Sequence, residues 1–213
     1  TEIYTLSLHD ALPISDAGSP VYDKPLRMNE KTTVKASIFR EGKMVGRIST
    51  KVININKASG MKVQYNTPFS DRYRGHGDRT LVNGINGSGD FNDGHWQGFE
   101  GTDMDVVTDL GQLTRVTSVT SSYMAAVGSW IFLPQSVEYH YSSDGRDFIP
   151  LGTVTTETDP ADQGNRIETY FTSFPSVEAR YIRVVARGQI TCPPWHAGAG
   201  NRAWLFCDEI IVE

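Results

Sequence analysis

The fold of this chain is decided by residues 134–148, PQSVEYHYSSDGRDF. Apolar and polar side chains alternate along its first half, with Val137, Tyr139 and Tyr141 on one face and Glu138 and His140 on the other. This two-residue period is typical of a strand with one buried face. The residues that follow, SSDGR, suit a hairpin turn because glycine adopts positive φ freely. The stretch therefore predicts a β-hairpin whose apolar face packs on a core.

Short segments of the same kind recur on both sides of this hairpin, separated by Gly, Asn, Asp and Pro. We expect further strands at residues 104–110, 116–122, 166–171, 180–186 and 203–212. Helical periodicity is almost absent after residue 16. The pattern predicts an all-β protein in which residues 57–213 form one complete sandwich domain.

Residues 16–56 contain two more alternating stretches, at 32–39 and 47–55, with a turn at 41–43. This is about half of an immunoglobulin-like sandwich, which usually has about seven strands. We therefore expect a truncated immunoglobulin-like β segment in front of the complete domain. A segment of so few strands should be only marginally stable alone.

Composition and motifs narrow the function. The 213 residues carry a formal net charge of −5 without a basic cluster, which argues against nucleic acid as a partner. No apolar run approaches the ~20 residues of a membrane span. The acidic residues fall in turns or at strand ends, and no hydrolase or phosphate-binding motif occurs. We therefore expect a protein that is not an enzyme.

Two cysteines, Cys192 and Cys207, lie 15 residues apart. Their parity permits one disulfide in an extracytoplasmic protein. The position of Cys207 in an apolar strand suits a buried free thiol equally well. The sequence leaves both alternatives open.

Six phrases of the complete domain carry a family resemblance through their order and spacing. They are LVNG (81–84), HWQGF (95–99), VVTDLG (106–111), the hairpin at 134–148, ARYIRVVA (179–186) and WLFCDEIIVE (204–213). Together they resemble the discoidin or F5/8 type C domain, and within it carbohydrate-binding module family 32. The resemblance implies a discoidin-like β-sandwich of the jelly-roll type.

Within that family, the domain resembles most closely the C-terminal module of bacterial exo-β-N-acetylhexosaminidases. Residues 20–46, PVYDKPLRMNEKTTVKASIFREGKMVG, are similar to the small β domain that follows the catalytic barrel in chitobiases and β-hexosaminidases. The resemblance implies a non-catalytic module that targets a glycoside hydrolase to glycans with terminal galactose or N-acetylhexosamine. It also implies an extracytoplasmic monomer (secreted, periplasmic or at the cell surface) with an upstream catalytic domain in the parent chain.

Two alternatives to sugar binding remain. A structural domain that packs on the parent catalytic barrel without a ligand would bury Trp130 and Trp195. A protein-interaction discoidin domain would present a large exposed apolar patch on the same loops.

Sugar recognition needs a flat aromatic ring and a few rigid polar groups, which this family carries on loops at one end of the sandwich. Two loops offer such groups, GSWIF at 128–132 and CPPWHAGAGNR at 192–202. The residues predicted for the sugar are Trp130 or Trp195 for stacking, with His196, Asn201 and Arg202 for the hydroxyls. Trp96 and Trp204 lie in strand-like phrases and are predicted to be core residues.

The family's most regular feature is a structural calcium ion between an early loop and the last strand. The matching ligands are the carbonyls of Thr80 and Asp208 and the side chains of Asn83, Ser88 and Glu209. Ca²⁺ selects oxygen donors of these kinds. Asn83 replaces the usual aspartate and removes a charge, for which Asp90 and Asp93 could compensate. Alternatively, Asn83-Gly84 is only a turn and Glu209 an exposed strand residue.

The first fourteen residues, TEIYTLSLHDALPI, resemble the translation of a common sequencing adapter, and Ser15 fits the partial codon that follows. The resemblance implies a reading frame from environmental DNA that is truncated upstream, so that no native signal peptide is visible. We therefore leave residues 1–15 out of the predicted fold. The alternative is a natural amphipathic N-terminus.

Overall fold

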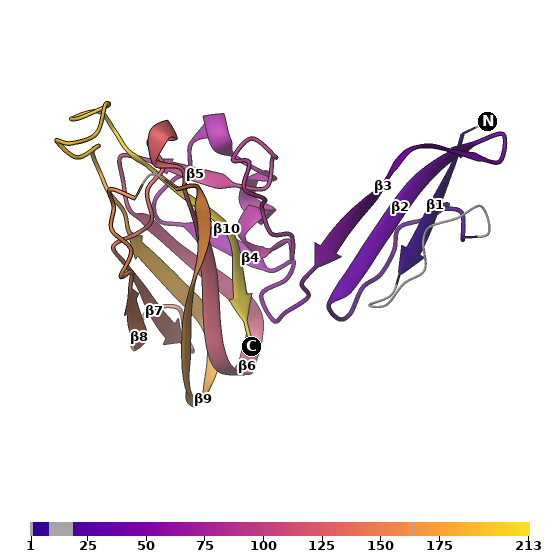
Figure 1. Ribbon diagram of the computed structural model, residues 1–213. Coiled ribbons are helices and arrows are strands. Elements are labelled where there is room, and N and C mark those ends of the chain that lie inside the picture. The colour runs from indigo at the N-terminus through magenta and orange to yellow at the C-terminus, as the bar shows by residue number, and fades with distance from the viewer. Residues whose placement is uncertain (1, 9–18, 163) are drawn as a thin grey trace. The chain divides into compact units, whose positions relative to one another are not determined.

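The computed structural model describes residues 2–8, 19–162 and 164–213 (Figure 1). The chain divides into two units, Thr1–Asn56 and Lys57–Glu213. The described residues are almost entirely β structure, which confirms the predicted all-β class. Their helices are short 3-10 turns, and none is long and apolar enough to cross a membrane.

The first unit is a three-stranded antiparallel sheet in the order β1–β2–β3. Its strands are β1 (Glu2–Leu8), β2 (Thr32–Arg40) and β3 (Lys43–Ile53). Glu41 and Gly42 join β2 to β3 with φ values of 52° and 76°, as a tight hairpin requires, which confirms the predicted turn. Among the described residues of this unit only Ser37, Phe39 and Ile53 are buried, so its core is small.

Strand β1 lies in the stretch that we left out of the predicted fold. It pairs with residues 34–40 of β2 in an unbroken antiparallel register. The β-branched and aromatic residues of IYTLSL favour an extended strand whatever their origin. The rest of the adapter-like stretch, residues 9–15, lies outside the described residues.

The second unit is a larger β structure with three short 3-10 helices among its described residues. Its strands are β4 (Lys62–Tyr65), β5 (Gln97–Glu100), β6 (Met104–Ala125), β7 (Ser136–Ser142), β8 (Ile149–Thr155), β9 (Arg166–Arg187) and β10 (Trp204–Val212). The helices are η1 (Asp71–Tyr73), η2 (Gly77–Val82) and η3 (Val127–Ser129). β6 and β9 each unite two strands that the sequence predicted as separate.

A local irregularity explains these long strands. The ladder between β6 and β9 shifts register between Asp109 and Thr114 and again between Val116 and Ser118. Gly111, directly after the strand predicted at 104–110, has a φ of 81°. A bulge accommodates such a residue and bends the strand without ending it.

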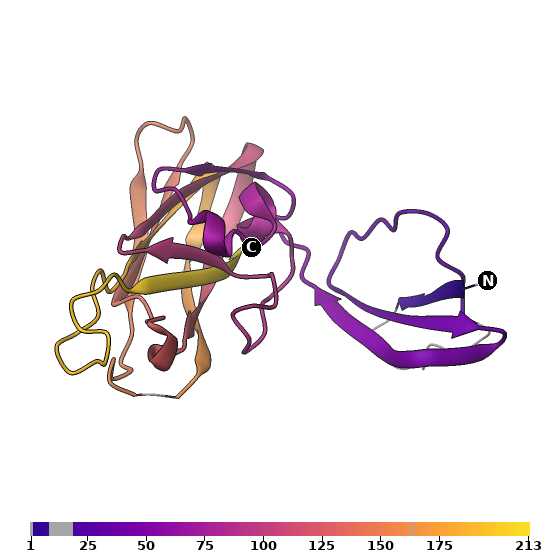
Figure 2. The same cartoon turned by 90° about the horizontal axis from the view of Figure 1, so that it is seen from above.

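The bends allow β6 and β9 to take part in both layers of a sandwich (Figures 1 and 2). In one layer the first half of β6 pairs with β4, and the second half of β9 pairs with β7, which pairs with β8. In the other layer the second half of β6 pairs with β10, and β10 pairs with β5. The predicted sandwich is confirmed, and Gly145 supplies the positive φ (78°) of the β7–β8 turn.

Side chains of both layers meet in one core, where Val137 and Tyr139 of β7 are fully buried as predicted. Three side-chain hydroxyls find hydrogen-bond partners inside this core. Ser121 Oγ lies 2.7 Å from Tyr139 Oη, which donates to the Tyr170 carbonyl at 2.9 Å. Tyr170 Oη donates in turn to the Pro134 carbonyl at 2.8 Å. Burial raises the pKa of Tyr170 to about 12, because the ionised phenolate would be poorly solvated in the core.

Two arginines of β9 form two-pronged ion pairs with aspartates of β6. Arg183 donates to both oxygens of Asp105 at 2.9 and 2.6 Å, and Arg180 donates to both oxygens of Asp109 at 2.9 and 3.1 Å. Burial acts to raise the pKa of Asp105, but hydrogen bonds from Arg183 and Asn66 outweigh it and hold the pKa below its usual value. These pairs fix β9 against β6.

We predict that Asp105→Asn lowers the free energy of unfolding by about 1 kcal/mol at pH 7. A carboxyl whose pKa is lower in the folded state stabilises the fold above its unfolded pKa of about 3.9 and loses this effect as the pH falls through the folded value. The difference between wild type and variant should therefore shrink below about pH 4. Urea unfolding from pH 7 to pH 3 measures it, and a difference that does not change with pH would contradict the ion-pair account.

Candidate functional site

The last strand carries two adjacent buried carboxylates, Asp208 and Glu209, which are 0% and 1% exposed. Neighbouring residues of a regular strand point to opposite faces. Here the pairing of β10 with β6 shifts register between Cys207 and Ile210. The irregularity lets both acidic residues face the loop that follows η2, in a strand whose residues 204–210 are all buried. The alternative in which Glu209 is an exposed strand residue is therefore wrong.

The glycine-rich loop after η2 supplies hydrogen bonds to both carboxylates. The backbone N–H of Gly84 lies 3.0 Å from each carboxylate oxygen of Glu209. Asp208 Oδ2 accepts from the N–H of Gly87 at 2.8 Å and from Asn86 Nδ2 at 3.2 Å. Asp208 Oδ1 accepts a short bond from the hydroxyl of Ser122 on β6. The two side chains thus tie the loop to the sandwich.

This site buries two acidic groups without a positively charged partner among the described residues. Burial raises the pKa of Glu209 to about 8, and the neighbouring Asp208 adds to the rise. Burial also raises the pKa of Asp208, against the hydrogen bonds that Ser122 and Gly87 donate to it. Among the described residues, no Lys, Arg or His forms an ion pair with either carboxylate. A bound cation would relieve this cost.

The predicted calcium ligands can be located around this loop. Asn83 and Glu209 are brought together through Gly84, although Asn83 Oδ1 already accepts from the N–H of Ile85 at 2.8 Å. Thr80 is fully buried in η2, which packs on β10. Ser88 is exposed further along the loop, where its N–H donates to Asp93. Within the described part of the chain, no three His, Cys, Asp or Glu side chains converge on one metal position. Calcium binding therefore stays a prediction. Glu209 would be the one carboxylate ligand, and the other ligands would be carbonyl, amide and hydroxyl oxygens.

The carboxylates predicted to compensate for Asn83 bond within their own segment. Asp93 accepts from the N–H groups of Ser88 and His95 at 2.6 and 2.9 Å. Asp90 Oδ1 accepts from the N–H of Asn92 at 2.9 Å. Both residues thus hold the loop in shape.

At the loop end of the sandwich, Trp130 presents its side chain to solvent, with 37% of it exposed. It follows η3 and has a φ of 69°, which is rare for a residue with a bulky side chain. Its N–H donates to the Val127 carbonyl and its carbonyl accepts from Trp204 N, both at 2.8 Å. A strained conformation held in this way commonly marks a functional site.

The Trp130 side chain borders a hollow of about 350 Å³, within the usual size range of ligand pockets. This Trp130 hollow is lined by Arg72, Tyr73, Phe91, Ser129, Trp130, Ile131 and Trp204. The guanidinium of Arg72 lies 5.3 Å above the Tyr73 ring. Neither the Arg72 guanidinium nor the Tyr73 hydroxyl has a hydrogen-bond partner among the described residues. The hollow therefore combines aromatic walls with unused donors.

Loop 192–202 contacts the Trp130 ring through Gly198 and is held together by its own hydrogen bonds. His196 is buried, and its Nδ1 accepts from the N–H of Gly198 at 2.9 Å. Its Nε2 lies 2.8 Å from the Val127 carbonyl, so the assigned tautomer carries the proton on Nε2. Because both ring nitrogens are engaged, binding a sugar hydroxyl would require His196 to break one of these bonds.

The other predicted polar residues also support the loop. Asn201 Nδ2 donates to the Gly198 carbonyl at 3.0 Å, while the residue itself is exposed. Arg202 is exposed, and its stem lies over Gly101. Gly198 sits directly against the Trp130 ring, where a Cβ would come within 2.7 Å of the indole. The loop therefore fixes Trp130, and the hydroxyl-binding roles of His196, Asn201 and Arg202 stay predictions.

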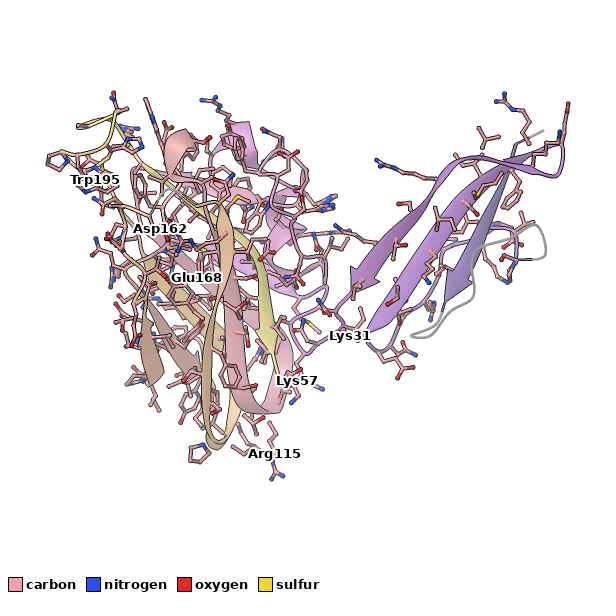
Figure 3. The ribbon with its side chains drawn as sticks, viewed as in Figure 1. Lys31, Lys57, Arg115, Asp162, Glu168 and Trp195 are labelled. Atoms are coloured by element: carbon pink, nitrogen blue, oxygen red, sulfur yellow. The ribbon has the colours of Figure 1, made fainter. Side chains whose placement is uncertain are left out.

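Trp195 is 48% exposed on the same loop (Figure 3). Trp96 and Trp204 are 1% and 6% exposed, which confirms their prediction as core residues. Cys192 and Cys207 are both buried free thiols, which resolves the open question of a disulfide.

Sequence reasoning missed Arg72, Tyr73 and Phe91, which complete the Trp130 hollow. They precede Trp130 by about forty to sixty residues. Only the packing of η1, which carries Arg72 and Tyr73, and of the loop before β5, which carries Phe91, brings them there. The available signal was the aromatic and basic cluster FSDRYRG at 69–75, in a segment without strand periodicity.

The comparisons with known proteins agree with this architecture. The sequence profile of the F5/8 type C domain matches residues 61–206, more than half of the chain. The chain belongs to the F5/8 type C domain family. A second profile, described as Fn3 associated, matches residues 3–53. No curated protein matches the chain.

Several solved structures resemble this F5/8 type C protein at low identity. Chitosan-binding module 1 of a chitosanase/glucanase from Paenibacillus sp. IK-5 has 16% identity and a TM-score of 0.49, over 75% of this chain and 99% of that one. The Clostridium perfringens module CpGH89CBM32-4, solved with GlcNAc-α-1,4-galactose, has 13% identity and a TM-score of 0.48, over 75% and 94%. SpGH29 has 15% identity and a TM-score of 0.47 over 74% of this chain, which spans only 27% of its length.

The glycine-rich loop after η2, which bonds to Asp208 and Glu209 and is called the carboxylate loop below, predicts the effect of one glycine substitution. Gly87 lies flush against the Trp96 indole, so the methyl group of Gly87→Ala would overlap the ring. We expect the substitution to lower the free energy of unfolding by about 1–3 kcal/mol, measured by thermal or urea unfolding. Gly89→Ala is the matched control, because its Cβ meets no atom within 4 Å. Equal stability of the two variants would contradict the described packing.

Proposed function

We propose that this F5/8 type C domain is a non-catalytic carbohydrate-binding module whose sugar site is the Trp130 hollow. The observation that carries the proposal is the strained, rigidly held Trp130, which keeps 37% of its side chain exposed. Fixing a large aromatic ring in solvent costs free energy that a bound ligand recovers. The Trp130 indole is therefore preorganised to stack on a small apolar surface of a ligand.

The chemistry of the hollow suits a single pyranose ring. Trp130 offers a flat face for the C–H side of the sugar, while Arg72 and Tyr73 offer donors for its hydroxyls. The volume of about 350 Å³ is at the lower end of the range for ligand sites. Terminal galactose or N-acetylhexosamine is the ligand class that we propose, in line with the family resemblance.

The two alternatives receive less support. A purely structural domain predicted that Trp130 and Trp195 would be buried, whereas they are 37% and 48% exposed. A protein-interaction domain predicted a large apolar patch on the same loops. The aromatic side chains instead border hollows that also contain polar groups.

We further propose that the module serves a glycoside hydrolase in the same parent chain and acts outside the cytoplasm. The resemblance of residues 20–46 to a hexosaminidase-associated domain supports this proposal. An isolated loop-end site buries little of its ligand, so its affinity should be modest. Attachment to a catalytic domain would convert that modest affinity into a higher local substrate concentration.

A structural Ca²⁺ at the carboxylate loop is the second part of the proposal. The Glu209 carboxylate, the Asn83 amide oxygen, the Ser88 hydroxyl and the carbonyls of Thr80 and Asp208 would hold it. The ion would neutralise the buried carboxylate and fix the loop to β10. The support is the burial of Glu209 without a positive partner among the described residues.

Removing the Trp130 ring should weaken sugar binding by about tenfold or more, because truncating a central aromatic contact commonly has this effect. Titration calorimetry of Trp130→Ala against galactose, N-acetylgalactosamine and N-acetylglucosamine measures the change. Trp130→Gly is a second variant, which also relieves the positive φ and should keep the melting temperature of the wild type.

The matched control is Phe171→Ala, which removes another aromatic ring that is 54% exposed and borders none of the described hollows. It should bind like the wild type. A folded wild-type protein that binds none of the three sugars would overturn the proposed function. Sugar binding that survives both Trp130 substitutions unchanged would overturn the proposed site.

Calcium should raise the melting temperature by about 5 °C or more relative to chelator, because ligands that bind only the folded state stabilise it. Magnesium should have little effect, since it demands a smaller octahedral site. Glu209→Gln should abolish the response to calcium. Glu178→Gln, at an exposed position on β9, is the control and should retain it. An equal melting temperature of the wild type in calcium and in chelator would rule the ion out.

A further inference from the structure

The Trp195 side of loop 192–202 borders a second and larger hollow of about 630 Å³. Its walls include Pro160, Gln189, Thr191, Pro193, Pro194 and Trp195. The two prolines stiffen the loop, and its backbone is closed by bonds between Cys192 and Asn201 and between Gly200 and Cys192. Trp195 is thus displayed by a rigid segment, like Trp130 on the other side.

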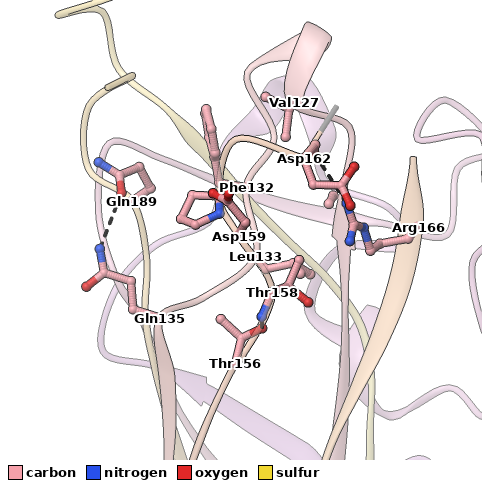
Figure 4. Close-up of a pocket in the computed structure, with 12 residues that line it drawn as sticks. Val127, Phe132, Leu133, Gln135, Thr156, Thr158, Asp159, Asp162, Arg166 and Gln189 are labelled. Atoms are coloured by element: carbon pink, nitrogen blue, oxygen red, sulfur yellow. Dashed lines mark hydrogen bonds and ion pairs between the residues drawn. The ribbon is translucent and has the colours of Figure 1, made fainter. Parts of the chain in front are cut away.

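A small cavity adjoins this Trp195 hollow (Figure 4). Pro160 and Gln189 line both, and the Phe132 ring of the cavity lies 6.3 Å from the Trp195 ring. Gln135 and Gln189 stand on one side of the cavity, with an amide–amide bond of 3.3 Å, and the Asp162–Arg166 ion pair stands on the other. The two spaces adjoin at Pro160 and Gln189, and we refer to them together as the groove, whose lining combines apolar side chains with polar groups.

The groove is separate from the Trp130 hollow. The two share no lining residue, and the backbone of loop 192–202 lies between them, with Gly198 pressed on the Trp130 ring. A ligand in the groove would therefore touch Trp195 and leave Trp130 unchanged. This separation makes the two sites experimentally distinguishable.

We propose that the groove is a second carbohydrate site, which takes an oligosaccharide segment of two or more neutral sugar units. The inference extends the proposed sugar-binding function to a longer ligand. Trp195 would stack on one unit, and its volume, almost twice that of the Trp130 hollow, leaves room for a neighbouring unit. The Asp162–Arg166 pair neutralises two of the three charges on the rim, and the remaining Asp159 carboxylate disfavours an anionic ligand.

Polar groups that could bind the hydroxyls remain available along the rim. The Thr191 hydroxyl and Asp159 Oδ2 have no hydrogen-bond partner among the described residues, although Asp159 Oδ1 accepts from the N–H of Ala161 at 2.9 Å. Gln189 Nε2 donates to the Thr191 carbonyl at 2.8 Å, which fixes the amide in place. A fixed ring beside a few oriented polar groups is the arrangement that sugar recognition requires.

The test follows the four indole N–H signals of the full chain by nitrogen-15 NMR, assigned through Trp130→Phe and Trp195→Phe. The probes are N-acetylglucosamine and its β-1,4-linked trimer. We expect the trimer to shift the Trp195 signal at about tenfold lower concentration than the monosaccharide. Gln189→Ala should weaken trimer binding, followed by the Trp195 signal, by about tenfold while the Trp130 signal still responds, and Trp195→Ala should leave the Trp130 response unchanged. Ile190→Ala, beside the groove and 44% exposed, is the control.

The outcomes separate this inference from the proposed function. A Trp195 signal that stays in place while the Trp130 signal moves would overturn the second site and leave the first. A Trp195 signal that moves while the Trp130 signal stays would support the groove and overturn the Trp130 site. Equal response of the Trp195 signal to trimer and monosaccharide would reject the oligosaccharide preference. If neither signal moves with either sugar, both proposals fail.

Discussion

The structure depends on the burial of two adjacent carboxylates at the irregularity in β10. An ordinary strand would point Asp208 and Glu209 to opposite faces, so only one of them would face the loop after η2. The register shift lets both face it, where backbone N–H groups of Gly84 and Gly87 become their partners. A long glycine-rich loop is thereby fastened to the last strand. Trp96 packs on the same loop, and the core beside it supports Trp204 and the segment around Trp130.

The loops at this end of the sandwich are held in place by hydrogen bonds to the same part of the structure. Trp204 N donates to the Trp130 carbonyl, so the start of β10 positions the exposed ring directly. His196 fastens loop 192–202 to the Val127 carbonyl, next to the same turn. Two aromatic side chains are thus held in solvent by short, closed loops. Such preorganisation lowers the ordering cost of binding a weakly held ligand.

Much of the fold could be predicted because its signals are local. The two-residue period and Gly145 predicted the β7–β8 hairpin, and the strand context of Trp96 and Trp204 predicted their burial. The continuity of β6 was not predicted. A glycine after an alternating stretch can end the strand or lie in a bulge within it, and the sequence looks the same in both cases. Trp130 and Trp195, the two residues predicted for stacking, lie in loops outside the strand pattern and are exposed.

The remainder of the site depends on contacts between distant segments. Arg72 and Tyr73 reach the Trp130 hollow from η1, and no local pattern connects them to residue 130. Both ring nitrogens of His196 form hydrogen bonds within the protein, and one of these bonds is to the carbonyl of Val127, a distant residue in the sequence. The family resemblance assigns a role only to the carbonyl of Asp208, and the burial of its side chain depends on the loop after η2, which no local pattern connects to β10.

The most direct test of the sugar-binding account is the retention of the labelled wild-type chain on an array of immobilised glycans, beside Trp130→Gly. The account predicts retention on glycans that end in galactose or N-acetylhexosamine, and its loss in the variant. A folded wild-type chain that is retained by no glycan above the level of the variant would contradict it.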